Sequence, residues 1–564
     1  MFLTPSDTVA RYQESGSWSG ENVDALVRRA VASGTAQHGN RPALIDPPNR
    51  ASLDGRAPER LSWAELDERI DGIATALLAH GLGKDDVIVA QLPNTVDAVL
   101  LLLAAARIGA ILSPVVMQYR AHELAYIVRQ TEPAVFVTVP AFAGYDHAAL
   151  AREFMRGDAG KVLLFGDNAC ALRSKSADRA RVADYARTHP TVGGEVLTIC
   201  WTSGTEARPK GVPRDHNHWV LNADVVVEGA GMEPGDTILN PFPLVNIGSI
   251  GGMVLPWLAL TGTLVLHHPF NLAIFLAQIA AERVTYTIAP PAVLTALLKA
   301  PEMLEQVDFA SLRGVGSGSA PLSPWLIEGW ARRGIEITNI FGSNEGASLF
   351  SGARDVPDWT DRSRYFPRYG AAGQDWAGVV HRVIRTRLVD PGSGEEISER
   401  GRAGELRIAG GTTFAQYWRA PELTAQAFDA EGYFRTGDLF EIAGEGEPAR
   451  FYRFVGRSKE IIVRGGVNIS PAELDDLLVG EPHVREAATV GIPDDVLGER
   501  IAVAVVANES GAPTLAEITA WLELRAVAIF KHPERLVVMD ALPRNAMNKV
   551  MRGVLRERVI ELLG

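Results

Sequence analysis

Segments with the apolar spacing of a helix alternate along this chain with short apolar runs of the kind that form buried strands. The helical spacing occurs at residues 23–33, 62–80, 95–108 and 121–130. The short apolar runs lie at residues 87–91, 134–139, 162–165, 237–240 and 285–289. Strands and helices that alternate in this way build mostly parallel sheets with helices packed on their faces. We therefore predict an α/β fold made of layered α/β subdomains.

The pattern changes between about residues 373 and 455, where short strands are separated by Gly-rich turns such as GRAGELRI at 401–408. This change indicates a smaller β-rich subdomain. We predict a boundary near residues 456–459, which divides the chain into domains at 1–457 and 458–564. In the second domain, helical segments at 471–478 and 515–527 alternate with strand-like runs at 487–492, 501–507 and 535–538, which indicates a small α+β domain. Disorder is expected only at the termini and in loops such as 46–60.

The size and charge of the chain exclude several classes of function. A chain of 564 residues is too long for one hydrophobic core, so several domains or subdomains are expected. The formal net charge of −13 argues against nucleic acid or an anionic membrane surface as the main partner. Two cysteines are too few for a disulfide framework, which suits a reducing cytosol. The N-terminus carries no basic segment followed by an apolar run, and we expect a cytoplasmic protein.

Two apolar segments, 96–116 and 249–266, imitate membrane spans. The first contains Asp97, Arg107 and Pro114, and the second is interrupted by glycines and by Pro256. We interpret both as buried helices, the second followed by a strand at 263–266, and we predict no membrane span. Whether two copies of the chain form a homodimer is left open.

A polar loop follows the strand-like run at 196–201 and is the strongest functional signal in the sequence. It begins with Thr202-Ser203-Gly204-Thr205 and closes, after a Pro-stiffened turn, on Lys210. Hydroxyls, flexible backbone and a lysine in one loop can hold a polyphosphate. Because Pro209 stands where an ordinary P-loop has glycine, the loop does not indicate a common kinase or GTPase. An ordinary Ser/Thr/Gly surface turn is the alternative interpretation.

Five further motifs stand in order along the chain. They are FGSNEG at 341–346, YFRTGDL at 433–439, GRSKEII at 456–462, GGVNI at 465–469 and NAMNKVMR at 545–552. Together with the loop they resemble the adenylate-forming superfamily, which comprises acyl- and aryl-CoA synthetases, carrier-protein-loading adenylation domains and luciferases. The resemblance covers nearly the whole chain. It implies a large N-terminal domain and a small, mobile C-terminal domain.

The resemblance implies that the N-terminal domain binds ATP. In a Gly-flanked turn, Glu345 is placed to present a carboxylate to Mg²⁺, and Phe341 to lie against adenine. The alternatives are a solvated turn acid and a core phenylalanine. The remaining residues that the resemblance assigns to ATP or AMP are Thr202, Ser203, Gly204, Thr205, Lys210, Gly318, Ser319, Ala320, Gly342, Ser343, Asn344, Asp438 and Arg457.

Four residues are expected to serve the chemistry: Lys549, Glu345, Thr202 and Lys210. The resemblance places Lys549 against the substrate carboxylate and the α-phosphate, where a cation reduces repulsion between two anions. It places Asp438 on the ribose hydroxyls and Arg457 beside the ribose and phosphate. A structural ion pair is the alternative for Asp438 and Arg457, and an exposed helix-end lysine for Lys549.

The resemblance also implies a second half-reaction with coenzyme A. Lys459 occupies the hinge position, about which the C-terminal domain rotates between adenylation and thioester formation. Gly465 and Gly466 line the tunnel for the pantetheine arm. The acid is expected to be apolar and medium-chain, alicyclic or aryl, in a pocket lined by Val245, Asn246, Ile247, Ser249, Val315 and Gly316.

The chain departs from the family pattern at three places. Glu206-Ala207 stands where Thr-Gly is common, Asn344 replaces the usual Thr, and Asn246 lies where a His is frequent. An Asn near that point contacts the substrate in some aryl-acid-activating members, which favours a ring-bearing or hydroxylated acid; an Asn that caps a turn is the alternative. We predict an ATP-dependent acid–CoA ligase that releases AMP and pyrophosphate. A stand-alone enzyme that loads a carrier-protein pantetheine, and a non-catalytic binding protein of the same fold, are the alternatives.

Overall fold

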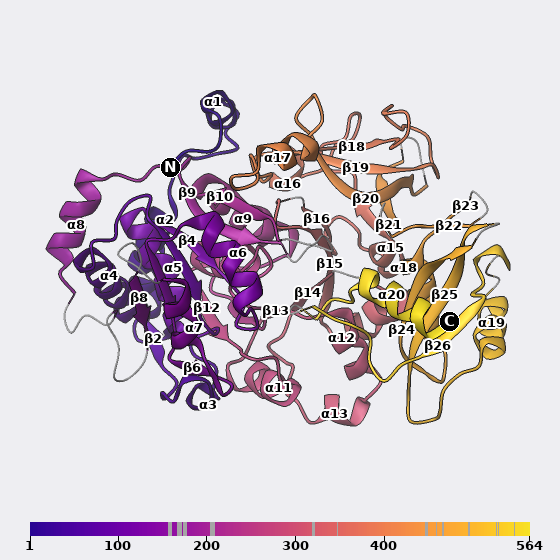
Figure 1. Cartoon of the computed structure of the whole chain (residues 1–564). Coiled ribbons are helices and arrows are strands. Elements are labelled where there is room, and N and C mark those ends of the chain that lie inside the picture. Colours follow the sequence, from indigo (N-terminus) through magenta and orange to yellow (C-terminus); the bar gives the residue numbers. More distant parts are fainter. Residues whose placement is uncertain are drawn as a thin grey trace.

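The structure is a computed structural model that describes residues 1–155, 161–165, 172, 177–202, 209–318, 322–346, 348–445, 449–457, 460–464, 467–494, 497–525, 527, 529–545 and 548–563. These residues form several sheets, of which two with helices on both faces make up most of the N-terminal domain (Figure 1). A third, antiparallel sheet adjoins them. A fourth sheet lies in the small C-terminal domain, at the right in Figure 1. The predicted fold class is therefore confirmed.

The first sheet orders its strands β10-β9-β4-β3-β5-β8, and β9 through β8 run parallel. The strand bounds are β3 Val87–Gln91, β4 Ile111–Pro114, β5 Val135–Thr138, β8 Lys161–Leu164, β9 Val196–Trp201 and β10 Gly211–Asp215. Every residue of β3, β4, β5, β9 and β10 is buried. Strands covered on both faces read as continuous apolar runs, which is why β3, β5, β8 and β9 could be predicted. The interpretation of residues 96–116 as one buried helix is wrong at its C-terminal end, because the helix stops at Ile108 and β4 follows it.

The second sheet has the order β16-β15-β14-β13-β11-β12-β1-β2, with antiparallel strands only at its two edges. Its strands are β1 Pro42–Ile45, β2 Arg60–Ser62, β11 Thr237–Asn240, β12 Thr263–Leu266, β13 Tyr286–Ile288, β14 Gly314–Gly318, β15 Glu336–Gly342 and β16 Ser348–Ser351. One face packs against helices α11 (Leu272–Ala281), α12 (Pro291–Leu298), α13 (Pro301–Glu305) and α14 (Pro324–Ala331).

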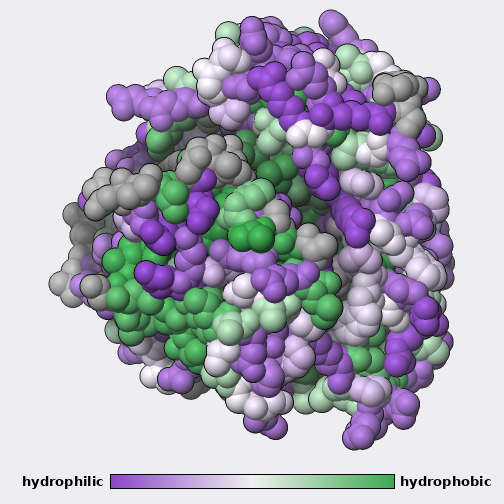
Figure 2. Space-filling model, turned by 90° about the vertical axis from the view of Figure 1, so that its right-hand side faces the viewer, coloured by the Kyte–Doolittle hydropathy of each residue, from purple (hydrophilic) through white to green (hydrophobic). Residues whose placement is uncertain are grey.

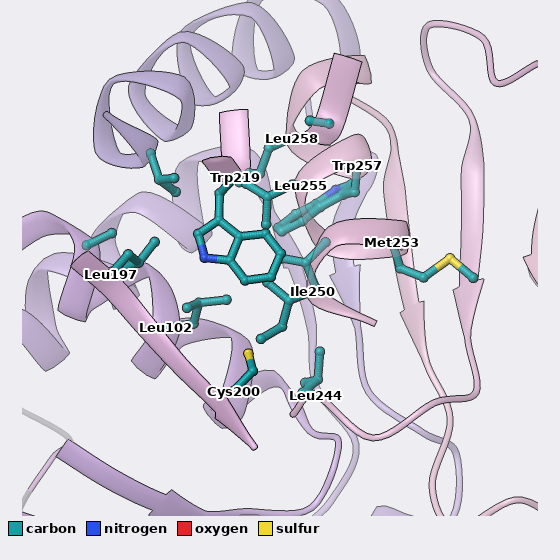
Figure 3. Packing of buried hydrophobic residues seen from close by; sticks show 14 of the residues in the cluster. Leu102, Leu197, Cys200, Trp219, Leu244, Ile250, Met253, Leu255, Trp257 and Leu258 are labelled. Atoms are coloured by element: carbon teal, nitrogen blue, oxygen red, sulfur yellow. The ribbon is translucent and has the colours of Figure 1, made fainter. Parts of the chain in front are cut away.

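The largest core lies between the two sheets. It is built by helices α2 (Val23–His38), α4 (Trp63–Ala79), α5 (Val96–Ile108), α9 (His216–Gly229) and α10 (Leu255–Leu260) and by the π-helical turn η1 (Ile250–Val254). Figure 3 shows its centre, where Trp219 lies among Leu197 and Cys200 of β9 and Ile250, Leu255 and Leu258 of η1 and α10. Helices α6 (Ala121–Thr131) and α7 (His147–Phe154) cover the opposite face of the first sheet. Since η1, α10 and β12 are buried, the apolar segment at 249–266 is a core element, as predicted.

The third and fourth sheets correspond to the β-rich subdomain and the C-terminal domain. The third is ordered β17-β21-β20-β19-β18, with strands β17 Tyr365–Pro367, β18 Ile384–Val389, β19 Ala403–Gly410, β20 Phe434–Ala443 and β21 Phe451–Arg457 and helices α15 Trp359–Arg364, α16 Val379–Val383 and α17 Pro421–Ala427. The fourth contains β22 Ile462–Arg464, β23 Val467–Ile469, β24 Val484–Asp494, β25 Gly498–Ala507 and β26 Arg535–Val538, with α18 Pro471–Leu478, α19 Leu515–Leu524, the 3₁₀ turn η2 Ile529–Lys531 and α20 Arg552–Leu563. The long hairpin of β24 and β25 carries both faces of this domain's core.

The expectation that residues 46–60 are disordered is wrong. This segment contains the short helix α3 (Arg50–Asp54), and Arg50 is fully buried in ion pairs with Asp46 and Asp97. The polar composition that suggested a mobile loop instead supplies charges that pair with one another inside the protein. The remaining elements are α1 (Ser6–Glu14), at the top of Figure 1, α8 (Arg179–Thr188) and the short strands β6 (Ala141–Phe142) and β7 (Tyr145–Asp146).

The surface is mixed in polarity. Figure 2 shows the side that bears the C-terminal domain, where hydrophilic residues predominate and hydrophobic residues gather toward the lower left. Within the described ranges, no helix combines the length and the apolar character needed to cross a bilayer.

Candidate active site

The base of the predicted phosphate loop is closed by two hydrogen bonds between Thr202 and Lys210. The Thr202 N–H donates to the Lys210 carbonyl at 3.0 Å, and the Lys210 N–H donates to Thr202 Oγ1 at 3.2 Å. They continue the antiparallel pairing of β9 with β10, in which Gly211 lies opposite Trp201. Ser203, Gly204, Thr205, Glu206 and Ala207 lie outside the described residues. The two ends of the loop, Thr202 and Lys210, therefore lie at the end of the β9–β10 pair, at the edge of the first sheet.

The carboxylate of Glu345 lies in the tight turn that follows β15. The Gly346 N–H donates to the Ser343 carbonyl at 2.9 Å, and Gly346 has a φ of 95°, which favours glycine. Glu345 is 9% exposed, and its Oε1 accepts a hydrogen bond from the Tyr417 hydroxyl at 2.9 Å. The ring of Tyr417 also lies 5.4 Å from Lys210 Nζ. Tyr417 thus contacts both the predicted Mg²⁺ ligand, Glu345, and the predicted phosphate-binding residue Lys210.

Asn344 joins the phosphate loop to the predicted acid pocket. Its Oδ1 accepts from the Ile247 N–H at 3.0 Å, and its Nδ2 donates to the Trp201 carbonyl at 3.3 Å. Threonine is the usual residue at this position in the family that the sequence resembles. Its side chain is shorter and has a single hydroxyl, so it cannot reach both of these backbone groups as asparagine does. Among the described residues, the buried Ser343 Oγ finds no hydrogen-bond partner, and Gly342 is exposed beside it.

Phe341, which was expected to face adenine, is only partly buried. Its ring packs edge-on against Phe440 of β20, with ring centroids 5.1 Å apart, and also contacts Phe366. Phe341 therefore joins the second sheet to the third, while Gly318 of the neighbouring strand β14 stays partly accessible. Phe341 therefore packs in the core with part of its surface accessible, and its contact with adenine stays a prediction.

Asp438 and Arg457 face each other across strands β20 and β21. Arg457 Nε lies 3.2 Å from Asp438 Oδ1, and Asp438 is 6% exposed. Burial raises the pKa of Asp438 to about 6, although the positive charges of Arg457 and Lys549 oppose that shift. The carboxylate is therefore held ready to accept hydrogen bonds at neutral pH, and it loses this capacity in mild acid.

Lys549 reaches this pair from the C-terminal domain. Its backbone forms a small loop with Asn545, in which the Lys549 N–H donates to Asn545 Oδ1 at 3.0 Å. The residue as a whole remains exposed, yet surrounding protein atoms desolvate the ammonium and lower its pKa, and the cation of Arg457 lowers it further. Glu460 and Asp438 act in the opposite direction. The structure therefore brings a lysine from near residue 550 to the end of β20 and β21.

The predicted acid pocket is only partly assembled as expected. Asn246 is buried, and its Oδ1 accepts from the Ser249 N–H at 3.1 Å, so this oxygen caps the turn that leads into η1. Ser249 in turn accepts a hydrogen bond from Asn240 Nδ2 at 2.7 Å. Val245 is buried next to Leu244, at the wall of a small apolar cavity that reaches the first sheet. The turn-capping interpretation of Asn246 thus holds for its oxygen.

Val315 does not share a face with Gly316. Val315 packs in the core beneath helices α11, α12 and α14, whereas a Cβ on Gly316 would meet Tyr286, Ile288 and Ile340, which belong to the central core. Successive residues of a strand point to opposite faces, so only one of the two can line a pocket. We therefore exclude Val315 from the pocket and keep Gly316.

Several predicted residues lie outside the described part of the chain. They are Ser319 and Ala320 of the adenine stretch, Lys459 of the hinge, and Gly465 and Gly466 of the predicted tunnel. Among the residues that the structure describes, no three His, Cys, Asp or Glu side chains gather in a way that could hold a metal ion. Mg²⁺ commonly takes one or two carboxylates plus substrate phosphates, so Glu345 fits a Mg²⁺ ion that arrives with a nucleotide.

Two residues of the site were missed from the sequence: Tyr417 and Arg214. Tyr417 carries the hydrogen bond to Glu345, and Arg214 Nη1 donates to the Asn344 carbonyl at 3.1 Å. The sequence offered only weak signals, an aromatic pair after β19 and a lone basic residue inside a buried strand. Neither signal identifies its partner, because each partner lies far away in the chain.

Sequence comparisons show the family to which the chain belongs. A model of the AMP-binding enzyme family matches residues 31–418, and one of the AMP-binding enzyme C-terminal domain matches residues 473–549. An indoleacetate–CoA ligase of Aromatoleum aromaticum is 30% identical over 509 residues, covering 89% of this chain and 94% of that protein. A salicyl-AMP ligase / salicyl-S-ArCP synthetase of Mycobacterium tuberculosis is 30% identical over 567 residues, covering 98% and 94%.

Solved structures show the same architecture. The crystal structure of ATP-bound MatB from Rhodopseudomonas palustris superimposes with a TM-score of 0.75 at 26% identity, covering 96% of this chain and 100% of that chain. The agreement therefore extends over both the large and the small domain.

Proposed function

The chain belongs to the family of AMP-binding enzymes and is an adenylate-forming ligase, and from this premise we propose that it couples a carboxylic acid to the thiol of coenzyme A. The acid carboxylate attacks the α-phosphate of ATP, and pyrophosphate leaves. The CoA thiol then attacks the acyl carbonyl, and AMP leaves. The observation that carries the proposal is the convergence of Lys549 from the C-terminal domain on the Asp438–Arg457 pair of the N-terminal domain.

The residues of this chain divide the first half-reaction between them. Thr202 and Lys210 hold the base of the loop that receives the leaving phosphates. Asp438 accepts hydrogen bonds from the ribose hydroxyls, and Arg457 keeps that carboxylate ionised. We assign Lys549 to the substrate carboxylate and the α-phosphate, because a fixed cation between two approaching anions lowers the barrier to in-line displacement.

Mg²⁺ would be held at Glu345 and would neutralise charge on the phosphates when bound. The carboxylate of Glu345 is oriented by Tyr417, and the turn is fixed by Gly346. Lys459 is proposed as the hinge, and Gly465 and Gly466 as the wall of the pantetheine tunnel, for the second half-reaction.

We infer that the acid carries a ring or an apolar body. In the predicted acid pocket, Ile247 has an apolar side chain and Gly316 has none. The segment that contains Ile247 is joined to Asn344 by the hydrogen bond from the Ile247 N–H. Two similar proteins are named for aromatic acids, indoleacetate and salicylate. Asn246 lies next to Ile247, and its side-chain oxygen caps the turn that leads into η1.

A carrier protein is the second candidate acceptor, favoured by the similarity to a protein named salicyl-S-ArCP synthetase. The deciding experiment measures pyrophosphate release over a panel of aryl, alicyclic and medium-chain acids, then offers the accepted acid with CoA and with a phosphopantetheinylated carrier protein. We expect AMP release and an acyl-CoA product. Product on the carrier protein alone would overturn the CoA assignment, and no pyrophosphate release across the panel would indicate a non-catalytic binding protein.

A further inference from the structure

Arg214 is an arginine with no solvent exposure near the end of β10. Within the described ranges, no carboxylate forms an ion pair with its guanidinium, and its Nε has no hydrogen-bond partner. The guanidinium lies 4.8 Å from the ring of Trp219, the residue at the centre of the core in Figure 3. Burial lowers its pKa to about 10, so the group remains charged at neutral pH. The nearby carboxylates of Asp215 and Glu345 oppose this shift of the pKa. A buried cation whose charge is balanced only at a distance is costly, and its position calls for an explanation.

The guanidinium donates to two backbone carbonyls that flank Glu345. Nη1 reaches the carbonyl of Asn344 at 3.1 Å, and Nη2 reaches the carbonyl of Thr412 at 3.0 Å. These carbonyls belong to segments that also bind each other, because the Phe414 N–H donates to the Glu345 carbonyl at 2.8 Å. Through these two hydrogen bonds, Arg214 links the turn that follows β15 to the segment that follows β19.

The packing around Gly346 shows how closely the turn rests on Arg214. A Cβ at Gly346 would lie 1.8 Å from the Thr412 carbonyl oxygen and 2.6 Å from Arg214 Nη1. A side chain at position 346 would collide with both groups, so only glycine allows the turn to approach Arg214 and Thr412 this closely. The position of the Glu345 carboxylate is thus set by main-chain contacts on one side and by the Tyr417 hydroxyl on the other.

We propose that Arg214 is a positioning residue that holds the Glu345 turn in the geometry required for Mg²⁺ and the nucleotide phosphates, and supplies a buried positive charge beside them. The proposal rests on the proposed function and adds to it a residue that touches neither substrate nor metal. The planar fork of arginine can serve two carbonyls at once, whereas a lysine is a point charge on a flexible stem. Arginine and lysine are therefore not equivalent at this position.

The test compares Arg214→Lys and Arg214→Gln with Arg368→Lys as a matched control. Arg368 is partly buried and belongs to the β-rich subdomain. Like Arg214, it donates to a backbone carbonyl (Ala449, 2.7 Å), lies over an aromatic ring (Tyr452, 5.3 Å) and has an Nε with no partner among the described residues. MgATP binding is measured directly by calorimetry, as a function of Mg²⁺ concentration, in the full-length protein. This measurement needs no acid, so it distinguishes failure of this proposal from failure of the acid–CoA ligase assignment.

We expect Arg214→Lys and Arg214→Gln to raise the half-saturating Mg²⁺ concentration and the Kd of MgATP by roughly tenfold, the size of effect that loss of a charge-assisted hydrogen bond produces. The KM of the acid should change less than twofold, and Arg368→Lys should change neither quantity. In a Glu345→Gln background the Arg214→Lys substitution should have no further effect on Mg²⁺ dependence. The proposal is overturned if either Arg214 variant folds and binds MgATP with unchanged Mg²⁺ dependence, or if the Mg²⁺ effect persists undiminished without the Glu345 carboxylate.

Discussion

The side-chain oxygen of Asn344 accepts a hydrogen bond from the backbone N–H of Ile247 at 3.0 Å. The amide of the same side chain donates to the carbonyl of Trp201, the last residue before the phosphate loop. One side chain therefore connects the loop proposed to hold the acid with the strand that leads to the phosphates. Ligands at the two sites should influence each other through this residue.

Replacing Asn344 by Ala should weaken both substrates together. Two hydrogen bonds are lost, and each contributes about 1 kcal/mol, so the KM of the acid and the KM of ATP should each rise roughly three- to tenfold. Steady-state kinetics with one substrate varied at several concentrations of the other measures the coupling. Asn344→Thr introduces the usual family residue and should restore the KM of ATP more fully than the KM of the acid. An unchanged KM of the acid in Asn344→Ala would contradict the coupling.

Lys549→Ala should separate the two half-reactions. We expect adenylate formation, measured by acid-dependent pyrophosphate exchange, to fall at least roughly 10²-fold, because a preorganised cation contributes about 3–4 kcal/mol to such a step. Thioester formation from a supplied acyl-adenylate should retain most of its rate. Lys531→Ala, which removes a lysine paired with Glu473 on the same domain's surface, is the control. Equal losses in both half-reactions would refute the role assigned to Lys549.

The pKa of Asp438 near 6 predicts a pH dependence with a definite sign. The carboxylate accepts hydrogen bonds from ribose only when it is ionised, so ATP binding should weaken as the pH falls through about 6. The measurement is kcat/KM for ATP of the wild type divided by that of Asp438→Asn at each pH. The ionisation of ATP itself affects both enzymes equally and cancels in this ratio. That ratio should fall with decreasing pH below about 6 and stay constant above 7.

The same pKa predicts an opposite effect on stability. The folded-state pKa of Asp438 is raised above its unfolded value, so the ionised carboxylate destabilises the fold above pH 6 and the penalty is relieved as the pH falls toward 4. Without nucleotide at pH 7.5, Asp438→Asn should therefore have a higher Tm than the wild type while it binds ATP less tightly. A lower Tm would show that the Arg457 ion pair outweighs the desolvation of the carboxylate.

Gly316→Ala should obstruct the acid pocket, and Tyr286→Phe should relieve the obstruction. A Cβ on Gly316 would lie 2.5 Å from the Tyr286 hydroxyl oxygen, which is buried and has no hydrogen-bond partner within the described part of the chain. We expect Gly316→Ala to raise the KM of the acid at least roughly fivefold. The added methyl group must displace neighbouring side chains, and such overpacking costs about 1–3 kcal/mol. The double variant should recover most of the loss.

Gly314→Ala is the control for this test. It adds the same methyl group two residues earlier on the same face of β14, where its nearest contact would be Tyr286 Cδ2 at 3.3 Å. Its effect on the KM of the acid should be much smaller. If both glycine variants raise the acid KM equally, the space beside Gly316 does not belong to the acid pocket.

The sequence alone determined the elements and the kind of chemistry. Fully buried strands such as β3 and β11 have the bounds that their apolar runs predict, because hydrophobic runs ended by turn residues are local signals. The motif residues Thr202, Glu345, Asp438 and Lys549 could be selected because the motifs that contain them, in this order, resemble those of the adenylate-forming superfamily. Val315 was a misinterpretation that local reasoning could have avoided, since adjacent strand residues cannot face one pocket.

Only the tertiary structure decided which side chains support one another. Arg214 and Thr412 are 198 positions apart, and Asn344 and Ile247 are 97 apart, yet each pair is joined by a hydrogen bond. The buried ion pairs of Arg50 with Asp46 and Asp97 order a segment whose composition suggests a mobile loop. Local patterns report burial and turn formation but not the partner of a buried polar group. That partner is set by the packing of whole sheets, because a buried charge or carbonyl must find its hydrogen bonds wherever the fold brings them.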